Sequence, residues 1–208
     1  MLAVLDYGAG NLRSVTRALA HVGCDFEVTS DPAATADARG VILPGVGAAA
    51  DTMAGLGSRG LLEPVKEYVS SGRPYLGICM GLQILFERSE EDDGTPCLNL
   101  YDGAIRRFSD GLHVPHMGWN QVHQNREVPI LQGVPQDANF YFVHSYFAPT
   151  DNRRVVGATT GYGVEFLSVL HDGNIFGTQF HPEKSGAPGL RIYANFASLC
   201  GEAVKGGI

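Results

Sequence analysis

The sequence of 208 residues has no long apolar run and no excess of positive charge. No segment approaches the ~20 consecutive apolar residues that a membrane-spanning helix needs, so we expect no membrane segment. Lysine and arginine together number 15, against 22 aspartates and glutamates, and the formal net charge is -7. Because no basic stripe is present, nucleic acid is not expected as a partner.

Cysteine is scarce and never paired. Cys24, Cys79, Cys97 and Cys200 are far apart, without the C-x-x-C spacing of zinc or redox sites. The opening stretch MLAVLDYGAG also lacks the basic region and the long apolar run of a signal peptide. We therefore expect a reduced, cytoplasmic protein.

The chain is rich in glycine, with 27 residues, as in a sheet whose strands are joined by tight turns. In the first half, short apolar strands alternate with helical patterns, which predicts a parallel sheet covered on both faces. Strands are predicted at Leu2–Tyr7, Cys24–Thr29, Val41–Leu43 and Tyr75–Cys79. Helices are predicted at Leu12–Val22, Leu61–Val69 and Leu82–Phe86, with Asp31–Arg39 as a connection of small residues.

The second half favours antiparallel strands that extend the same sheet. The strand-like runs are Ala104–Phe108, Phe140–Phe147, Val155–Thr160, Val164–Leu170 and Ile175–Phe180. A final helix places Leu190, Tyr193, Phe196, Ala197 and Cys200 on one face, spaced to dock on the sheet. With no repeat or linker in view, we expect one domain over residues 1–208.

One cysteine stands at a turn that core packing does not require. The stretch Gly77–Gly81, GICMG, is predicted to end a strand, turn sharply and begin a helix. This is the arrangement of a nucleophile elbow, with Cys79 in place of serine. The new helix N-terminus favours a thiolate, and the N–H of Met80 can meet a developing oxyanion. The alternative is a buried core cysteine before an ordinary turn.

A thiol nucleophile needs a base, and His181 is the best placed of the seven histidines. It follows a strand and is succeeded by Pro182 and Glu183. In an extended backbone residues i and i+2 project to the same side, so Glu183 can orient His181 as the third member of a triad. The alternative is a surface His-Pro-Glu turn.

Two other patterns are misleading. Gly8-Ala9-Gly10 follows a strand, but the third glycine of a dinucleotide fingerprint is missing, and a tight turn is the better interpretation. His113, His116 and His123 lie close in sequence, but no cysteine or carboxylate lies between them. We therefore expect no metal and no cofactor.

Six separated stretches together carry a family resemblance. They are DYGAGN near the start, PGVG at Pro44–Gly47, GICMGLQ, PHMGWN at Pro115–Asn120, YFVHSY at Tyr141–Tyr146 and GTQFHPEKS at Gly177–Ser185. The chain resembles the class I (triad) glutamine amidotransferases, and among them the glutaminase subunits of imidazole glycerol phosphate synthase from histidine biosynthesis. The resemblance implies a flavodoxin-like, mostly parallel sheet flanked by helices, with antiparallel strands in the C-terminal half.

The resemblance also assigns roles to single residues. It makes Cys79 the nucleophile, His181 the general base and acid, and Glu183 the orienting carboxylate. Its oxyanion residues correspond to Gly45, Val46 and Met80. Its glutamine-binding residues correspond to Gly47, Gln83, Glu91, His144, Ser145 and Tyr146.

The same resemblance implies a partner, the cyclase subunit, which is a (β/α)₈ barrel that receives the ammonia. The residues expected at this interface are Asn11, Met117, Trp119, Asn120, Tyr141 and Lys184, with Met117–Asn120 as an exposed loop. A core position is the alternative for Trp119, the only tryptophan. After PGVG the chain has three alanines, Ala48–Ala50, where relatives often carry a bulkier residue, so packing behind this loop is expected to differ.

Two alternatives to this function remain at the level of sequence. The chain could supply ammonia to another synthase, against which PGVG, PHMGWN and HPEKS argue. It could instead be a catalytically silent subunit that senses glutamine, against which the intact Cys79, His181 and Glu183 argue.

Overall fold

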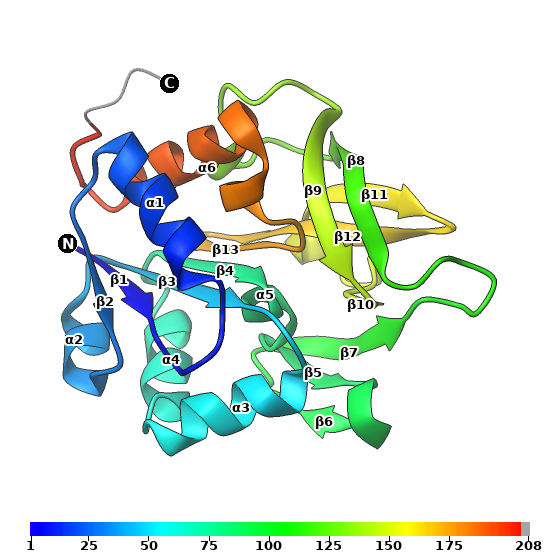
Figure 1. The fold of residues 1–208 in the computed structure, drawn as a ribbon, viewed down its shortest axis with the longest axis horizontal. Helices are drawn as coiled ribbons and strands as arrows, with labels where there is room; N and C mark the ends of the chain where they lie inside the picture. Colours follow the sequence, from blue (N-terminus) through cyan, green and yellow to red (C-terminus); the bar gives the residue numbers. More distant parts are fainter. Residues whose placement is uncertain (205–208) are drawn as a thin grey trace.

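The computed structural model describes residues 1–204 and is built around a nine-stranded mixed sheet (Figure 1). Five neighbouring strands are parallel: β2 (Phe26–Thr29), β1 (Leu2–Leu5), β3 (Gly40–Gly45), β4 (Tyr75–Cys79) and β13 (Ile175–Thr178). Four antiparallel strands continue the sheet: β12 (Val164–Asp172), β11 (Val156–Tyr162), β8 (His116–Gln124) and β9 (Ala138–His144). The predicted α/β class, with a parallel first half and an antiparallel extension, is confirmed.

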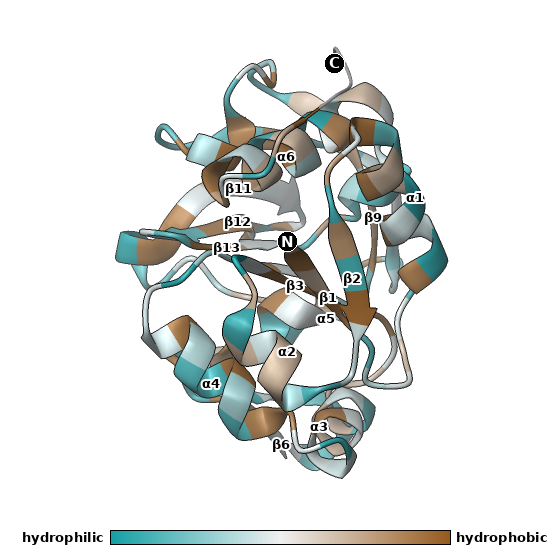
Figure 2. Cartoon of the chain, turned by 90° about the vertical axis from the view of Figure 1, so that its left-hand side faces the viewer, coloured by the Kyte–Doolittle hydropathy of each residue, from teal (hydrophilic) through white to brown (hydrophobic). Residues whose placement is uncertain are grey.

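Helices cover both faces of this sheet (Figures 1 and 2). On one face lie α1 (Leu12–Val22) and α6 (Gly186–Leu199), which pack against each other. On the other face lie α2 (Pro32–Asp37), α3 (Ala49–Ser58) and α4 (Leu62–Ser70). Each layer encloses its own apolar cluster against the sheet, since single strands such as β1 send alternate side chains into the two clusters. Among residues 1–204, no helix is long and apolar enough to cross a bilayer.

A smaller four-stranded sheet lies beside the end of β4. It consists of β10 (Tyr146–Phe147), β7 (Tyr101–Arg107), β5 (Phe86–Ser89) and β6 (Thr95–Pro96). Short segments complete the fold: helix α5 (Met80–Gln83) and the 3₁₀ turns η1 (Glu91–Asp93), η2 (Pro129–Leu131), η3 (Arg153–Val155) and η4 (Pro182–Lys184).

Three predictions of local structure are wrong. The helix expected at Leu82–Phe86 ends at Gln83, and Phe86 begins β5, because a short run of buried apolar residues fits a strand as well as a helix. The connection expected at Asp31–Arg39 contains α2, where the Asp31 side chain accepts a hydrogen bond from Ala33 N at 2.9 Å. The loop expected at Met117–Asn120 is the middle of β8, paired with β9.

Two histidines lie inside an aromatic cluster formed by β8, β9, β11 and β12. The ring of His116 stacks on Tyr162 with centroids 4.1 Å apart, and His144 lies 5.1 Å from Phe166. Burial lowers the pKa of His116 to about 4 and that of His144 to about 3. Both rings are therefore neutral near pH 7.

The elbow glycines give the first testable prediction. A Cβ on Gly81 would lie 2.0 Å from the carbonyl oxygen of Leu43, whereas a Cβ on Gly111 would meet nothing within 4 Å. Gly81→Ala should therefore lower the free energy of unfolding by about 3 kcal/mol or more, because the clash is with backbone. Gly111→Ala is the matched control, with a change within about 0.5 kcal/mol. Urea unfolding of both variants measures this, and equal stabilities would contradict it.

The histidine pair gives a prediction about pH. The unfolded chain binds protons on these histidines near pH 6.5, but the native chain does so only near pH 4 and 3. The free energy of unfolding should therefore fall as the pH drops below 6.5, by up to ~1.4 kcal/mol per pH unit for each histidine. His116→Phe keeps the stacked ring and removes one titration, so its urea-unfolding profile between pH 6.5 and 4 should be flatter. Parallel profiles for the two proteins would refute this assignment.

Candidate active site

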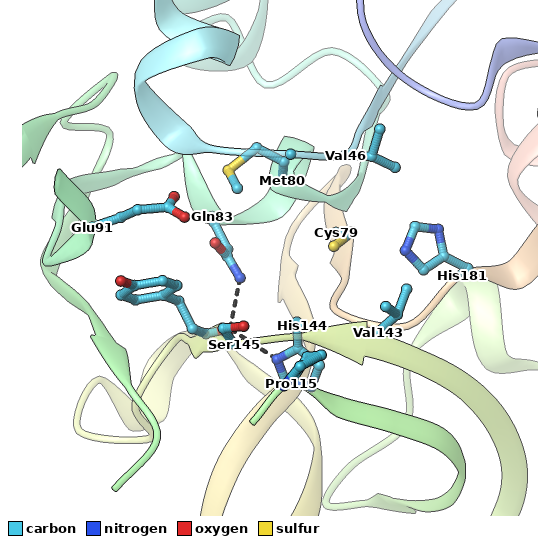
Figure 3. A pocket seen from close by; sticks show the side chains of 12 residues that line it. Val46, Cys79, Met80, Gln83, Glu91, Pro115, Val143, His144, Ser145 and His181 are labelled. Carbon is cyan, nitrogen blue, oxygen red and sulfur yellow. Dashed lines mark hydrogen bonds between the residues drawn. The ribbon is translucent and has the colours of Figure 1, made fainter. Parts of the chain in front are cut away.

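A pocket of about 290 Å³ opens where the carboxyl ends of β3, β4 and β13 meet (Figure 3). In open parallel sheets this edge is the usual place for ligands. The volume suits a molecule the size of an amino acid, at the lower end of the range for ligand pockets. The lining residues are Val46, Gly47, Cys79, Met80, Gln83, Glu91, Pro115, Val143, His144, Ser145, Tyr146 and His181.

Cys79 is the last residue of β4 and has a backbone conformation that side-chain-bearing residues rarely adopt. Its φ is 53° and its ψ is −102°, directly before α5 begins at Met80. Only glycine fits two residues before and two residues after Cys79, since a Cβ on Gly77 would lie 2.2 Å from the carbonyl oxygen of Gly81. The predicted strained turn is therefore present, and the cysteine that it holds is only 6% exposed and lines the pocket.

His181 and Glu183 form a buried pair. The imidazole Nδ1 lies 2.8 Å from Glu183 Oε1, and both side chains are almost fully enclosed. Glu183 also accepts a bond from the Tyr193 hydroxyl at 3.4 Å. The expected pairing is present, but not for the expected reason, because the backbone forms the turn η4 instead of an extended strand.

The other ring nitrogen of His181, Nε2, is buried and has no hydrogen-bond partner among the described residues. Figure 3 shows the ring beside Cys79 on one side of the pocket. Burial disfavours the imidazolium, but the negative charge of Cys79 and the bond to Glu183 together raise the pKa of His181 to about 10. A thiolate beside an imidazolium is the reactive form of a cysteine nucleophile.

The three residues expected around an oxyanion lie at one wall of the site. Gly45 is directly opposite Cys79 in the pairing of β3 and β4, and its Cβ would lie 2.5 Å from that of Met80. Val46 and Met80 both line the pocket. Gly47 has a φ of 89°, so the loop after β3 reverses direction at a position suited to glycine.

All six residues expected to bind glutamine line the same pocket: Gly47, Gln83, Glu91, His144, Ser145 and Tyr146. Glu91 Oε2 accepts a bond of 2.8 Å from the backbone of Ala49, the first residue of α3, and burial raises its pKa. The neighbouring Glu90 instead bonds to the backbone of Arg107. Of the two acidic residues, only Glu91 lines the pocket.

The residues expected at a partner interface gather near the outer surface of β8 and β9. Met117 and Trp119 are 62% and 60% exposed, so Trp119 is not a core residue. Trp119 is opposite Tyr141, with ring centroids 6.1 Å apart, and Lys184 Nζ lies 5.5 Å from the centre of the Tyr141 ring. Asn120 is partly buried on β8, and Asn11 is at the start of α1, which contacts η4.

The three clustered histidines have separate environments. His116 bonds to His144 at 2.9 Å, His123 pairs with Asp137 at 2.9 Å, and the backbone of His113 accepts a bond from Tyr162. Residues 1–204 contain no group of three histidine, cysteine, aspartate or glutamate side chains arranged to hold a metal ion.

Sequence reasoning missed three residues at the site. Pro115 and Val143 line the pocket, and Gln179 lies behind it with its amide 3.6 Å from the Cys79 sulfur. Gln179 stands two residues before His181, within the stretch GTQFHPEKS, so alternation along the strand could have indicated it.

Comparisons with known proteins agree with this geometry. Residues 3–199 match the model of the family "Glutamine amidotransferase class-I". The "Imidazole glycerol phosphate synthase subunit HisH" of Dehalococcoides mccartyi (strain CBDB1) is 50% identical over 199 residues, which is 96% of this chain and 97% of the relative. The HisH subunit of Moorella thermoacetica is 48% identical over 206 residues, covering 99% and 98%.

Solved structures share the fold at lower identity. A crystal structure of a glutamine amidotransferase superposes with a TM-score of 0.75 at 20% identity, over 96% of this chain and 98% of that one. PurLQS from Thermotoga maritima gives 0.72 at 19%, over 95% and 97%. The chain therefore belongs to the class I glutamine amidotransferase family and, within it, to the group of HisH subunits of imidazole glycerol phosphate synthase.

Proposed function

We propose that Cys79, His181 and Glu183 are the catalytic triad with which this glutaminase subunit of imidazole glycerol phosphate synthase releases ammonia from L-glutamine. The observation that carries the proposal is the combination of a cysteine on a strained elbow with a buried His–Glu pair beside it. An intact triad argues against a silent glutamine sensor. The relatives at 44–50% identity carry the HisH name, which argues against a role as the glutaminase subunit of another synthase.

The chemistry divides into two steps. The Cys79 thiolate attacks the side-chain amide carbon of glutamine, and the proton on His181 Nε2 passes to the departing nitrogen, which leaves as ammonia. Water, deprotonated by His181, then attacks the thioester, and glutamate leaves as the thiolate is restored. Glu183 keeps the ring oriented through Nδ1 in both steps.

The pocket walls supply binding and charge stabilisation in this proposal. Met80 N–H and an N–H of the Gly45–Val46 region would face the oxyanion, and each such donor is worth ~10²–10³ in rate. Glu91 is suited to the substrate ammonium group, because it is a carboxylate at the pocket rim. Gly47, Gln83, His144, Ser145 and Tyr146 would hold the rest of the glutamine.

We further propose that the ammonia passes to a cyclase subunit with a (β/α)₈ barrel, which forms imidazole glycerol phosphate and aminoimidazole carboxamide ribotide. The contact surface would comprise Asn11, Met117, Trp119, Asn120, Tyr141 and Lys184. Exposed apolar side chains next to a cation–aromatic pair suit the centre of an interface. We propose that the chain, residues 1–208, is a single domain, which the continuous nine-stranded sheet of the described residues supports. We also propose a cytoplasmic location, since a thiolate nucleophile suits a reducing compartment.

The roles of the two subunits predict separable activities. In the complex with its cyclase subunit, Cys79→Ala should reduce glutamine-dependent synthesis on the order of 10⁴-fold or more, since the nucleophile is lost. Synthesis from added ammonium salt should stay near the wild-type rate. Cys97→Ala, which alters a cysteine outside the pocket, is the control and should preserve both activities. Parallel loss of both activities in an assembled Cys79→Ala complex would show that the assigned role is wrong.

The surface of β8 and η4 predicts how the partner acts. The isolated chain should hydrolyse glutamine slowly, and the liganded cyclase subunit should accelerate it by changing the Pro44–Gly47 loop. Trp119→Ala should weaken docking ~30-fold in Kd, as expected for a central aromatic anchor worth about 2 kcal/mol. Lys184→Ala should reduce the stimulation more than the affinity, because one exposed charge contributes little binding energy.

A titration of glutaminase rate against cyclase concentration, with and without the cyclase ligand, measures both effects. Leu199→Ala, at an exposed apolar residue on α6, and Lys66→Ala on α4 are the matched controls. A wild-type chain that reaches its full rate alone would exclude activation by the partner, and unchanged docking by Trp119→Ala would exclude this surface.

A further inference from the structure

The backbone carbonyl of Tyr146 accepts two side-chain hydrogen bonds behind the pocket. His144 Nδ1 lies 2.8 Å from this oxygen, and Gln83 Nε2 lies 2.8 Å from it on another side (Figure 3). A carbonyl oxygen has two lone pairs and can only accept. Both neighbours must therefore donate, which fixes the tautomer of His144 and the orientation of the Gln83 amide.

The donor and acceptor roles within the histidine pair follow from these two bonds. Since neutral His144 carries its proton on Nδ1, its Nε2 is an acceptor, and His116 Nδ1 at 2.9 Å must donate to it. His116 Nε2 then accepts from Asn120 Nδ2 at 3.2 Å. The Asn120 amide is itself oriented, because its oxygen accepts from the backbone of Gln121 at 2.8 Å and its nitrogen donates to Gly161 at 3.1 Å.

The donor and acceptor roles between Gln83 and the nucleophile are fixed in the same way. Gln83 Nε2 uses its second hydrogen on Gln179 Oε1 at 3.0 Å. Because the Gln179 oxygen is thus the acceptor, its Nε2 is the atom that lies 3.6 Å from Cys79 Sγ and donates to the sulfur. Gln179 is fully buried and has no access to solvent that would let the amide turn.

We propose that Gln179 is a further catalytic residue of this site, which donates a hydrogen bond to the Cys79 sulfur, and that Gln83 is the positioning residue that holds it in that orientation. The proposal rests on the function of Cys79 as nucleophile. An N–H directed at the sulfur stabilises the thiolate, and a bond to a charged group is about twice as strong as a neutral one.

The Tyr146 carbonyl separates Gln83 from the histidine pair. Because this oxygen can only accept, it accepts from Gln83 whatever His144 does. The orientation of Gln179 therefore depends on Gln83 and not on the histidines.

The test is the rate at which iodoacetamide alkylates Cys79 as a function of pH, followed by mass spectrometry of the Cys79 peptide in the full chain. This measurement needs no glutamine and no partner. Gln179→Met keeps a side chain of similar length and removes the donor. The pH at which the alkylation rate reaches half its maximum should rise by about one unit, as expected for the loss of a hydrogen bond to a charged atom.

A variant of Gln83 tests the positioning role. Gln83→Leu removes the donor to Gln179 Oε1, so the same midpoint should rise by a smaller amount. His116→Phe preserves the ring stacked on Tyr162 and should leave the midpoint unchanged, because the Tyr146 carbonyl still accepts from Gln83. Gln124→Leu removes an amide that donates to Val134 and Pro135 outside the pocket, and should change nothing.

The outcomes separate the parts of the proposal. A Gln179→Met protein with an unchanged melting temperature and an unchanged alkylation profile would overturn the role of Gln179. A Gln83→Leu profile identical to that of the wild type would overturn the positioning role of Gln83. If Cys79→Ala retained glutaminase activity, the proposed triad would fail, whatever the alkylation profiles showed.

Discussion

The backbone at Cys79 is the constraint on which the rest of the site depends. Strand β4 turns into α5 within a single residue, and the turn is closed because Gly77 and Gly81 allow β3, β4 and α5 to approach without side chains between them. A positive φ at a non-glycine residue costs of order 1–3 kcal/mol and persists only when the surroundings impose it. Here the surrounding contacts are with backbone, so the sulfur is held in place by the fold itself.

Two histidines that line the same pocket have very different pKa values, because their environments differ. His144 has a pKa of about 3, because burial among aromatic rings disfavours the charged imidazolium. His181 is also buried, yet its pKa is about 10, because the charge of Cys79 and the Glu183 carboxylate oppose the cost of burial. The same side chain is therefore a fixed hydrogen-bond donor in one position and, in the proposed mechanism, a proton carrier in the other.

Much of the fold was predictable because its signals are local. Helix α1 has the predicted bounds, since Gly23 ends it in a left-handed conformation, and the elbow follows from the glycines beside Cys79. The strand at Met117–Asn120 was not predictable, because Met117 and Trp119 are apolar but exposed, which is not the usual pattern of a strand. Only the pairing with β9 identifies it as one. The role of Gln179 was equally hidden, since its partners are 96 and 100 residues away in the sequence.

Two polar atoms of the site take no part in the hydrogen bonds that orient its side chains. Gln83 Oε1 and His181 Nε2 are both buried and both lack a hydrogen bond among the described residues. A buried, unsatisfied polar atom costs about 1–3 kcal/mol, and a ligand that bonds to it recovers that energy. A molecule that bonds to both atoms therefore gains affinity, whereas an isostere without the matching polar groups leaves the cost in place and is rejected without any steric clash.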